Sequence, residues 1–272
     1  MEPVLKTVTS QDGTTIAYEQ SGTRPAIILV GALLSTHSDL AKLAALLAPN
    51  YTVINYDRRG RGQSTDTLPY AVQREVEDIE ALIDAAGGSA YLFGTSSSAV
   101  LALEAANKLN GKVKGLFMHE PPFIVDDSQP PMPADMTEQI SALVAANRRG
   151  DAVKLIFHKG MGIPAVFVTL MRLLMPGWKK MVGIAHTIPY DLAVLEGTQN
   201  GKPLPADRWT SVGVPTMVMV GSKSATFFHT GAQAIADLLP NAEYRVLEGG
   251  DHGTPMMSPK NLAPEVAGFF VS

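Results

Sequence analysis

Short, almost uniformly apolar runs recur along the chain and alternate with longer segments whose apolar residues have helical spacing. Six runs are bounded by glycine, proline or asparagine, as is typical of buried strands; they span residues 26–30, 52–56, 90–93, 114–118, 216–220 and 244–247. Most of them are apolar throughout instead of alternating, which suits a parallel sheet that is covered on both faces.

Helical patterns separate several of these runs, at residues 40–47, 71–86, 99–109 and 231–239. This alternation predicts an α/β fold with right-handed crossovers and a mostly parallel, doubly wound sheet. Residues 4–8 and 14–18, joined across Asp12-Gly13, predict an antiparallel hairpin at one edge of that sheet.

One long region breaks the alternation. No convincing strand is visible from about residue 126 to residue 209, which opens with Gln129-Pro130-Pro131-Met132-Pro133 and continues as several helical segments. The sequence therefore predicts a helical cap at residues 126–210, inserted into a core made of residues 1–125 and 211–272.

The length, charge and composition of the chain exclude several classes of function. A length of 272 residues fits one large α/β domain with an insertion, and the formal net charge of −4 gives no electrostatic reason to expect nucleic acid or an anionic membrane. The absence of cysteine excludes disulfides, thiolate nucleophiles and zinc–thiolate sites. No secretory signal is visible, and the longest apolar stretch, residues 163–178, is too short and too interrupted to span a bilayer. We expect a cytoplasmic protein that acts on a small molecule; its oligomeric state stays open.

A strand, a sharp turn of serines and a helix follow one another near residue 95. The turn Gly94-Thr95-Ser96-Ser97-Ser98 matches the nucleophile-elbow pattern G-x-S-x-G, with Ser98 in place of the last glycine. A strand that turns directly into a helix lifts the side chain at the apex out of the sheet, which makes Ser96 the candidate nucleophile. The alternative is that Ser96 merely caps the following helix. We expect Ser98 to be tolerated at some steric cost.

Three further motifs occur along the chain, two before this elbow and one after it. They are Val30-Gly31-Ala32, Tyr56-Asp57-Arg58-Arg59-Gly60-Arg61-Gly62-Gln63-Ser64, and Gly249-Gly250-Asp251-His252-Gly253. Together the four motifs resemble the α/β-hydrolase superfamily over essentially the whole chain. The resemblance implies Ser–acid–His acyl transfer. It makes His252 the base and gives the oxyanion-stabilising role to the backbone N–H groups of Ala32 and Ser97. The remaining histidines are interpreted as ordinary polar or partly buried residues, although His119 is close enough to a strand end to line a pocket.

The acid of the triad is displaced relative to the family pattern. The usual aspartate stands fourth in a turn after the seventh strand, and here that position is Ser224. Glu120, at the end of the sixth strand, is the next carboxylate able to reach the histidine, and it resembles the relocated glutamate of some haloalkane dehalogenases. Asp251 is adjacent to His252, and consecutive side chains rarely point at each other. We therefore predict that Glu120 orients His252.

The cap supplies apolar side chains and almost no acid between residues 154 and 187. In this superfamily the cap covers the nucleophile. We therefore expect some of these residues to line a pocket for a small to medium apolar substrate. The alternative is that they pack the cap against the core. The candidates are Phe157, Met161, Phe167, Met171, Met175, Trp178 and Met181.

No cofactor or metal site is predicted. No two histidines have ligand spacing with carboxylates, and Gly60 and Gly62 do not belong to a G-x-G-x-x-G motif that opens a helix. The favoured function is a serine hydrolase of carboxylic esters, thioesters or lactones that works through an acyl-enzyme. Acyltransferase, perhydrolase-type haloperoxidase, C–C hydrolase, lyase and cofactor-free oxygenase chemistry remain alternatives on the same scaffold. A non-catalytic ligand-binding protein is a third possibility, supported only by Ser98 and Ser224.

Overall fold

A computed structural model describes residues 4–270 and is built around a single eight-stranded sheet with the order β1-β2-β4-β3-β5-β6-β7-β8. The β1–β2 and β2–β4 pairs are antiparallel, and all the other neighbouring pairs are parallel. The predicted doubly wound α/β fold and its edge hairpin are therefore confirmed. The strands are β1 (Val4–Thr9), β2 (Thr15–Ser21), β3 (Ala26–Val30), β4 (Thr52–Tyr56), β5 (Ala90–Thr95), β6 (Val113–His119), β7 (Thr216–Gly221) and β8 (Ala242–Leu247).

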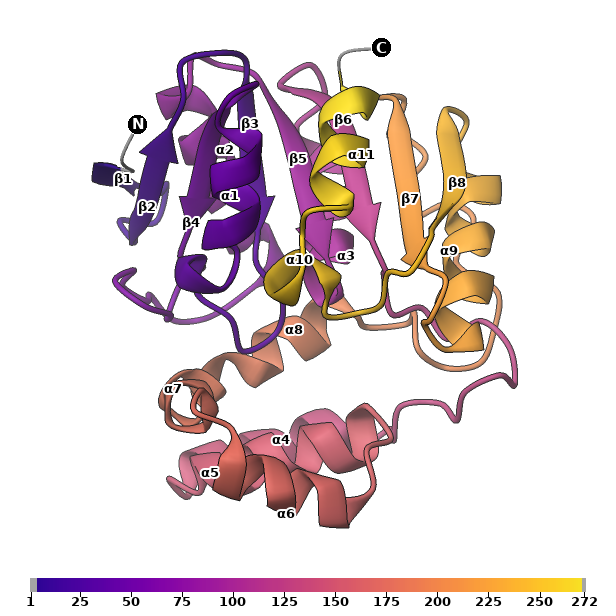
Figure 1. Ribbon diagram of the computed structural model, residues 1–272. Coiled ribbons are helices and arrows are strands. Elements are labelled where there is room, and N and C mark those ends of the chain that lie inside the picture. The colour runs from indigo at the N-terminus through magenta and orange to yellow at the C-terminus, as the bar shows by residue number, and fades with distance from the viewer. Residues whose placement is uncertain (1–3, 271–272) are drawn as a thin grey trace.

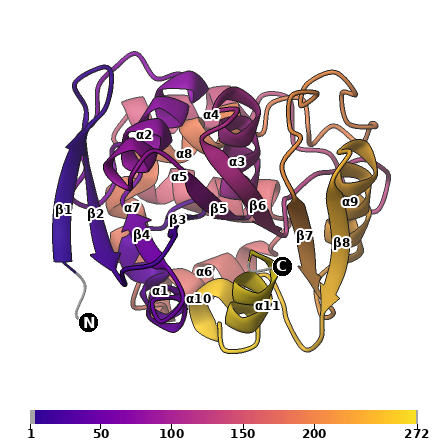
Figure 2. The same cartoon turned by 90° about the horizontal axis from the view of Figure 1, so that it is seen from above.

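Helices cover both faces of this sheet (Figures 1 and 2). One face carries α1 (Ala41–Leu47) and α11 (Leu262–Phe269), and the other carries α2 (Val72–Ala85), α3 (Ser97–Lys108) and α9 (Thr226–Leu238). Helix α9 begins five residues before the start that its apolar pattern predicts. A short helix, α10 (Thr254–Met257), precedes α11, and the 3₁₀ turn η1 (His37–Asp39) precedes α1.

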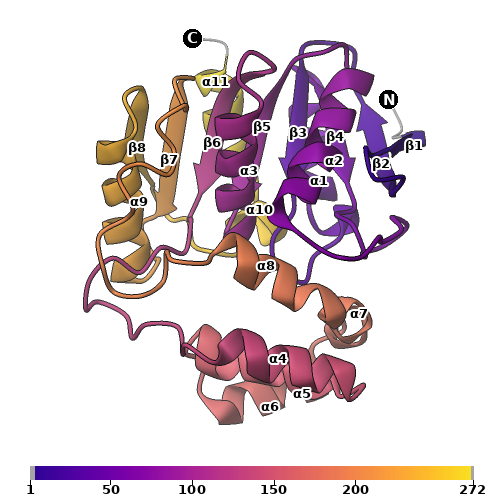
Figure 3. The ribbon, with the colours of Figure 1, turned by 180° about the vertical axis from the view of Figure 1, so that it is seen from behind.

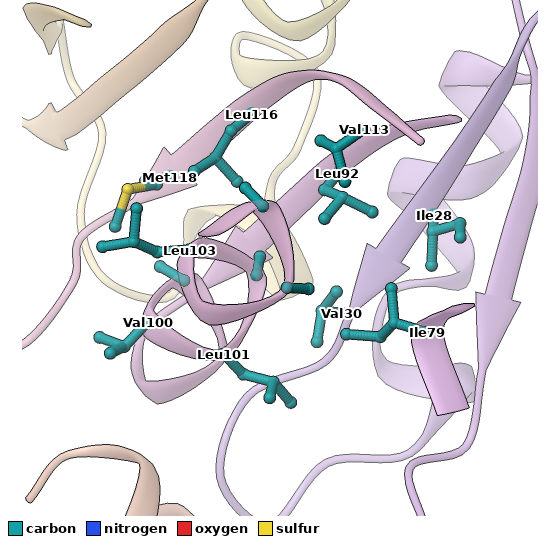
Figure 4. Packing of buried hydrophobic residues seen from close by; sticks show 14 of the residues in the cluster. Ile28, Val30, Ile79, Leu92, Val100, Leu101, Leu103, Val113, Leu116 and Met118 are labelled. Carbon is teal, nitrogen blue, oxygen red and sulfur yellow. The ribbon is translucent and has the colours of Figure 1, made fainter. Parts of the chain in front are cut away.

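The continuous apolar character of the strands follows from this double cover. Side chains alternate between the two faces of a strand, so a strand with a helix on each side must be apolar at every position. In β3, Ile28 and Val30 belong to the cluster under α2 and α3, whereas Ile27 and Leu29 belong to the cluster under α1 and α11. Figure 4 shows the first cluster, in which β3, β5 and β6 pack against α3.

A helical cap lies between β6 and β7, at the end of the sheet where β5 turns into α3 (Figures 1 and 3). Its helices are α4 (Met136–Ala145), α5 (Arg149–Leu155), the π-helical turn η2 (Ile156–Gly160), α6 (Ala165–Leu174), α7 (Trp178–Ile184), the 3₁₀ turn η3 (Ala185–Thr187) and α8 (Ile188–Val194). Helix α8 rests on the core next to α3, and α4, α5 and α6 lie beyond it. The helical insertion agrees with the sequence pattern, and the boundaries at residues 126 and 210 remain predictions.

No helix within residues 4–270 combines the length and the apolarity that crossing a membrane requires.

Candidate active site

Ser96 occupies a strained apex between β5 and α3. Its backbone has φ 57° and ψ −134°, a conformation that costs free energy and persists only where the surroundings hold it. Its N–H donates to the carbonyl of His119 at 2.9 Å, which ties the turn to the end of β6. Gly94 permits the turn because a Cβ at this position would lie 2.4 Å from the carbonyl oxygen of Ser98.

Ser98 joins the elbow to the loop after β3. Its side chain is fully buried, donates a hydrogen bond to the carbonyl of Gly31 and accepts one from Arg58 Nη1 at 2.9 Å. The Gly31 carbonyl and the Ala32 N–H belong to one peptide group, and in a trans peptide the two point in opposite directions. Ser98 therefore fixes the direction of the Ala32 N–H. From the sequence we expected Ser98 only to be tolerated at some steric cost. In the structure its hydroxyl links the elbow to the loop after β3 by a hydrogen bond.

Glu120 and His252 are in contact. The Glu120 carboxylate is fully buried, and its Oε2 lies 2.8 Å from His252 Nδ1. Its Oε1 accepts hydrogen bonds from the Gly221 N–H at 2.8 Å and from the Ser224 hydroxyl. The carboxylate predicted from the end of the sixth strand thus reaches the predicted histidine. Ser224, at the position where the sequence analysis places the family's usual aspartate, donates a hydrogen bond to Glu120.

These hydrogen bonds set the charge state of Glu120. Burial on its own raises the pKa of this carboxyl group, but donation from His252, Ser224 and the Gly221 N–H outweighs it. The net effect is a pKa below the usual value for glutamate. Glu120 is therefore an anion at neutral pH and can hold a proton on Nδ1 of His252.

The loop that carries His252 is held by a close backbone approach. A Cβ on Gly221 would lie 2.2 Å from the carbonyl carbon of Gly250, so only glycine lets the end of β7 reach this loop. Phe228 stacks on the His252 ring with a centroid separation of 4.7 Å. Asp251 Oδ1 instead accepts the Gly253 N–H at 2.9 Å, as expected if Asp251 shapes the loop and does not orient the ring.

Ser96 and His252 line the same cavity, which has a volume of about 330 Å³. Ser96 Oγ forms no hydrogen bond with any residue in the range 4–270, so its hydroxyl is free to turn toward the imidazole. Such hydrogen bonds commonly tighten only when substrate is bound. The apolar wall consists of Leu33, Pro122, Ile124, Met132, Ile156, Met161, Ile163, Leu192, Leu195, Ala225, Phe227 and Phe228.

Of the seven candidate pocket residues, only Met161 lines this cavity. Four of the others belong to a separate apolar core within the cap, and two lie on its outer surface. Phe157 and Trp178 pack edge to face inside that core, with centroids 6.2 Å apart. Met171 is packed beside them, as is Met181, whereas Phe167 and Met175 are 57% and 37% exposed on the outer surface.

The sequence predicts that the backbone N–H groups of Ala32 and Ser97 receive a developing negative charge. Ser97 is the first residue of α3, where N–H groups have no partner within the helix and the helix dipole favours an anion. Ala32 directly follows β3, and its own carbonyl accepts from Arg61 Nη1 at 2.8 Å. The role of these two N–H groups as an oxyanion hole remains a prediction and is part of the proposal below.

A buried ion-pair network that the sequence pattern did not reveal lies behind Ser97. Asp191 of α8 accepts hydrogen bonds from Ser97 Oγ at 2.7 Å, from Arg58 Nη1 at 2.6 Å and from Arg61 Nη2. Burial raises the pKa of Asp191, but the guanidinium groups of Arg58 and Arg61 lower it by more, so the pKa lies below the usual value for aspartate. Arg58 also pairs with buried Glu75 at 2.6 Å. The network fastens the cap to the turn after β4 and to the elbow.

His119 is buried beside Glu120 but does not line the cavity. Its Nδ1 lies 3.2 Å from the Thr95 hydroxyl, and its Nε2 has no hydrogen-bond partner among the described residues. Burial lowers the pKa of His119 to about 4, so the ring is neutral at physiological pH. In the part of the chain that the structure describes, no group of three or more metal-ligating side chains lies close together.

The model of the alpha/beta hydrolase family matches residues 27–265, which include Ser96, Glu120 and His252. The chain belongs to the alpha/beta hydrolase family. A crystal structure of an alpha/beta hydrolase from Sphaerobacter thermophilus is 47% identical and superposes with a TM-score of 0.89, covering 97% of this chain and 100% of the other.

Two further relatives of this alpha/beta hydrolase are more distant. A non-heme chloroperoxidase from Streptomyces lividans is 26% identical over 281 residues, covering 98% of this chain and all of the relative. A thermophilic esterase from Thermogutta terrifontis is 20% identical with a TM-score of 0.72, covering 100% of this chain and 98% of the other, and this likeness concerns the fold alone.

Proposed function

We propose that this alpha/beta hydrolase is a serine hydrolase that cleaves a small to medium apolar carboxylic ester, thioester or lactone through an acyl-enzyme. One observation carries the proposal: the buried Glu120 carboxylate lies 2.8 Å from His252 Nδ1, and His252 shares a cavity with the strained Ser96. An anion that fixes the proton on Nδ1 leaves Nε2 free to act as a base, which a serine hydroxyl needs in order to attack.

The reaction then follows from the positions of these groups. His252 Nε2 takes the Ser96 proton as Oγ bonds to the acyl carbon, and the N–H groups of Ala32 and Ser97 stabilise the oxyanion. The imidazolium gives its proton to the leaving alcohol or thiol as the acyl bond breaks. Water, deprotonated by the same nitrogen, attacks the acyl-enzyme and releases the carboxylic acid and free Ser96.

The walls of the cavity support a neutral substrate. They are mostly apolar, and no Lys or Arg stands among the lining residues of the described chain. The carboxylate of Asp191 reaches the wall, but Arg58, Arg61 and Ser97 already satisfy its oxygens. A substrate carboxylate would therefore be buried without a cationic partner, which is costly.

Labelling with a fluorophosphonate probe, which reacts with activated serines, tests whether Ser96 is activated. An activated Ser96 reacts with such a probe, and the Ser96→Ala variant does not, whereas a non-catalytic binding protein remains unlabelled in both forms. A panel of p-nitrophenyl esters then tests the substrate class. We expect butyrate to be turned over faster than the hemisuccinate of similar length, and a preference for the hemisuccinate would contradict the assignment.

Perhydrolysis is a second candidate, favoured by the full-length similarity to the Streptomyces lividans chloroperoxidase. Hydrogen peroxide would replace water in the second step, so the acyl-enzyme would yield a peracid and free Ser96. A peracid assay with acetate ester and hydrogen peroxide distinguishes the two functions. Peracid formation that exceeds hydrolysis under matched conditions would favour the second function.

A further inference from the structure

Helix α6 presents an apolar face to solvent. Seven of the thirteen large apolar residues exposed on the described chain fall within residues 161–175. At 100° per residue, five of them form an arc of about 120° along the helix. Contiguous exposed apolar surface of this kind marks interaction sites. We call this arc the apolar face of α6; it consists of Val166 (70% exposed), Phe167 (57%), Leu170 (49%), Leu173 (73%) and Leu174 (70%).

The opposite side of α6 holds it in the cap. Val168 is 2% exposed and Met171 is partly buried in the cap core, so the helix is fixed with its apolar face outward. Helix α6 lies at the outer edge of the cap, farthest from the sheet (Figures 1 and 3). Met161 and Ile163, in the loop just before it, line the catalytic cavity. The apolar face and the cavity are thus joined by one short segment of chain.

The charge of residues 148–190, which include α5, α6 and α7, contrasts with that of the rest of the chain, although the whole cap of residues 126–210 has nine basic and eight acidic residues. Residues 148–190 contain seven Lys and Arg and a single Asp, a formal charge of +6, while the remaining chain has 15 basic and 25 acidic residues, a formal charge of −10. Lys159, Arg172 and Lys179 are exposed and form no ion pair within residues 4–270. The overall charge of −4 therefore conceals a cationic segment, residues 148–190, that contains the apolar face of α6.

The positive charge of residues 148–190 indicates which kind of partner binds the apolar face of α6. A second copy docked through the same face would bring two copies of this cationic segment together, and like charges at short distance repel. An amphipathic helix within a segment rich in Lys and Arg is suited to the interface of an anionic bilayer, where apolar side chains enter the acyl boundary and basic ones meet the headgroups. We propose that the cap binds the surface of bilayers that contain anionic phospholipid, through the apolar face of α6 and the exposed basic residues of residues 148–190.

This surface role is independent of the proposed hydrolysis. The vesicle assay needs no substrate, and Ser96 takes no part in the apolar face, so Ser96→Ala should bind vesicles as the unmodified chain does. Failure of the proposed ester hydrolysis would therefore leave the vesicle result unchanged, and a negative vesicle result would leave the hydrolysis unchanged.

Sedimentation with vesicles tests the proposal on the full chain. We expect binding to equimolar phosphatidylcholine and phosphatidylglycerol and little binding to phosphatidylcholine alone. The Leu173→Gln/Leu174→Gln variant should lower the partition coefficient at least about tenfold, because two leucines no longer transfer from water to the acyl boundary. Arg172→Gln/Lys179→Gln should lower it by roughly fivefold per charge, and added salt should weaken binding.

The control pair is Val4→Gln/Leu5→Gln on β1, two adjacent apolar residues that are 56% and 50% exposed on the core. This variant should bind like the unmodified chain. Unchanged thermal melting of the Leu173→Gln/Leu174→Gln variant would show that its loss of binding is not unfolding. Three results would overturn the proposal: no vesicle binding, equal binding to both vesicle types, or a concentration-dependent dimer that the Leu173→Gln/Leu174→Gln substitution abolishes while vesicles have no effect.

Discussion

The Glu120→Gln variant tests how the relocated acid works. The substitution keeps the size of the side chain and removes its charge. The Gly221 N–H points at Oε1 from 2.8 Å, and only an oxygen can accept this hydrogen bond. The amide oxygen must therefore remain there, which places the amide nitrogen against His252 Nδ1, where Glu120 Oε2 now lies at 2.8 Å.

The amide nitrogen can only donate, so Nδ1 of His252 must become an acceptor and its proton moves to Nε2. That nitrogen then cannot take the proton of Ser96. In a Ser–His–Asp triad the analogous loss of the correct tautomer lowers kcat by about 10⁴ with the geometry intact. We expect a similar decrease here, equivalent to about 5.5 kcal/mol of transition-state stabilisation.

Steady-state hydrolysis of p-nitrophenyl butyrate measures this effect, with circular dichroism to confirm folding. Asp251→Asn is the matched control, because Asp251 is the neighbouring carboxylate and contacts its own loop instead of the ring. We expect that control to retain kcat within about tenfold, since it leaves the pairing of the ring with Glu120 in place. A Glu120→Gln variant with nearly full activity, or an Asp251→Asn variant that is equally impaired, would refute this reasoning.

Three other substitutions test separate parts of the structure. Ser98→Ala removes the hydrogen bond that holds the peptide group of the Ala32 N–H. We expect kcat to fall by roughly 10-fold to 100-fold with little change in KM, because this N–H acts on the transition state. Ser98→Gly, which restores the family pattern, is the comparison variant. Asp191→Ala leaves two guanidinium groups buried with one carboxylate and should lower the free energy of unfolding by about 3–5 kcal/mol in urea titrations. His119 has a pKa of about 4 in the folded chain and a usual value of 6.5, so only the unfolded chain binds its proton between these pH values. Stability should therefore fall as the pH is lowered from 6.5 to 4, and His119→Gln should remove roughly 3 kcal/mol of that pH dependence. An unchanged pH dependence would contradict the buried, neutral state of this ring.

The sequence pattern predicted the parts of the fold that are governed by local rules. Uniformly apolar strands and the turn from strand to helix at Ser96 are visible because burial on two faces and a strained apex restrict the residues at each position. Glu120 could be proposed because position 224 holds a serine, and the structure shows that serine donating to Glu120.

The positions of the cap side chains were predicted less well, because they depend on contacts with residues far away in the sequence. An apolar stripe indicates that a helix has a face but not what that face contacts. Phe167 and Met175 therefore look like pocket residues in the sequence and lie on the outer surface. Asp191 has no local signal either, since its partners Arg58 and Arg61 lie about 130 residues earlier in the chain.

The acyl-enzyme itself is the most direct test of the proposed function. Rapid mixing with p-nitrophenyl butyrate, acid quenching and mass spectrometry should show a burst of one p-nitrophenol per chain. The butyryl group should then be found on the peptide that contains Ser96, at the position of Ser96 and not of Ser97 or Ser98. The absence of a burst together with an unmodified Ser96 during turnover, or a butyryl group on another residue, would contradict the assignment of Ser96 as the nucleophile.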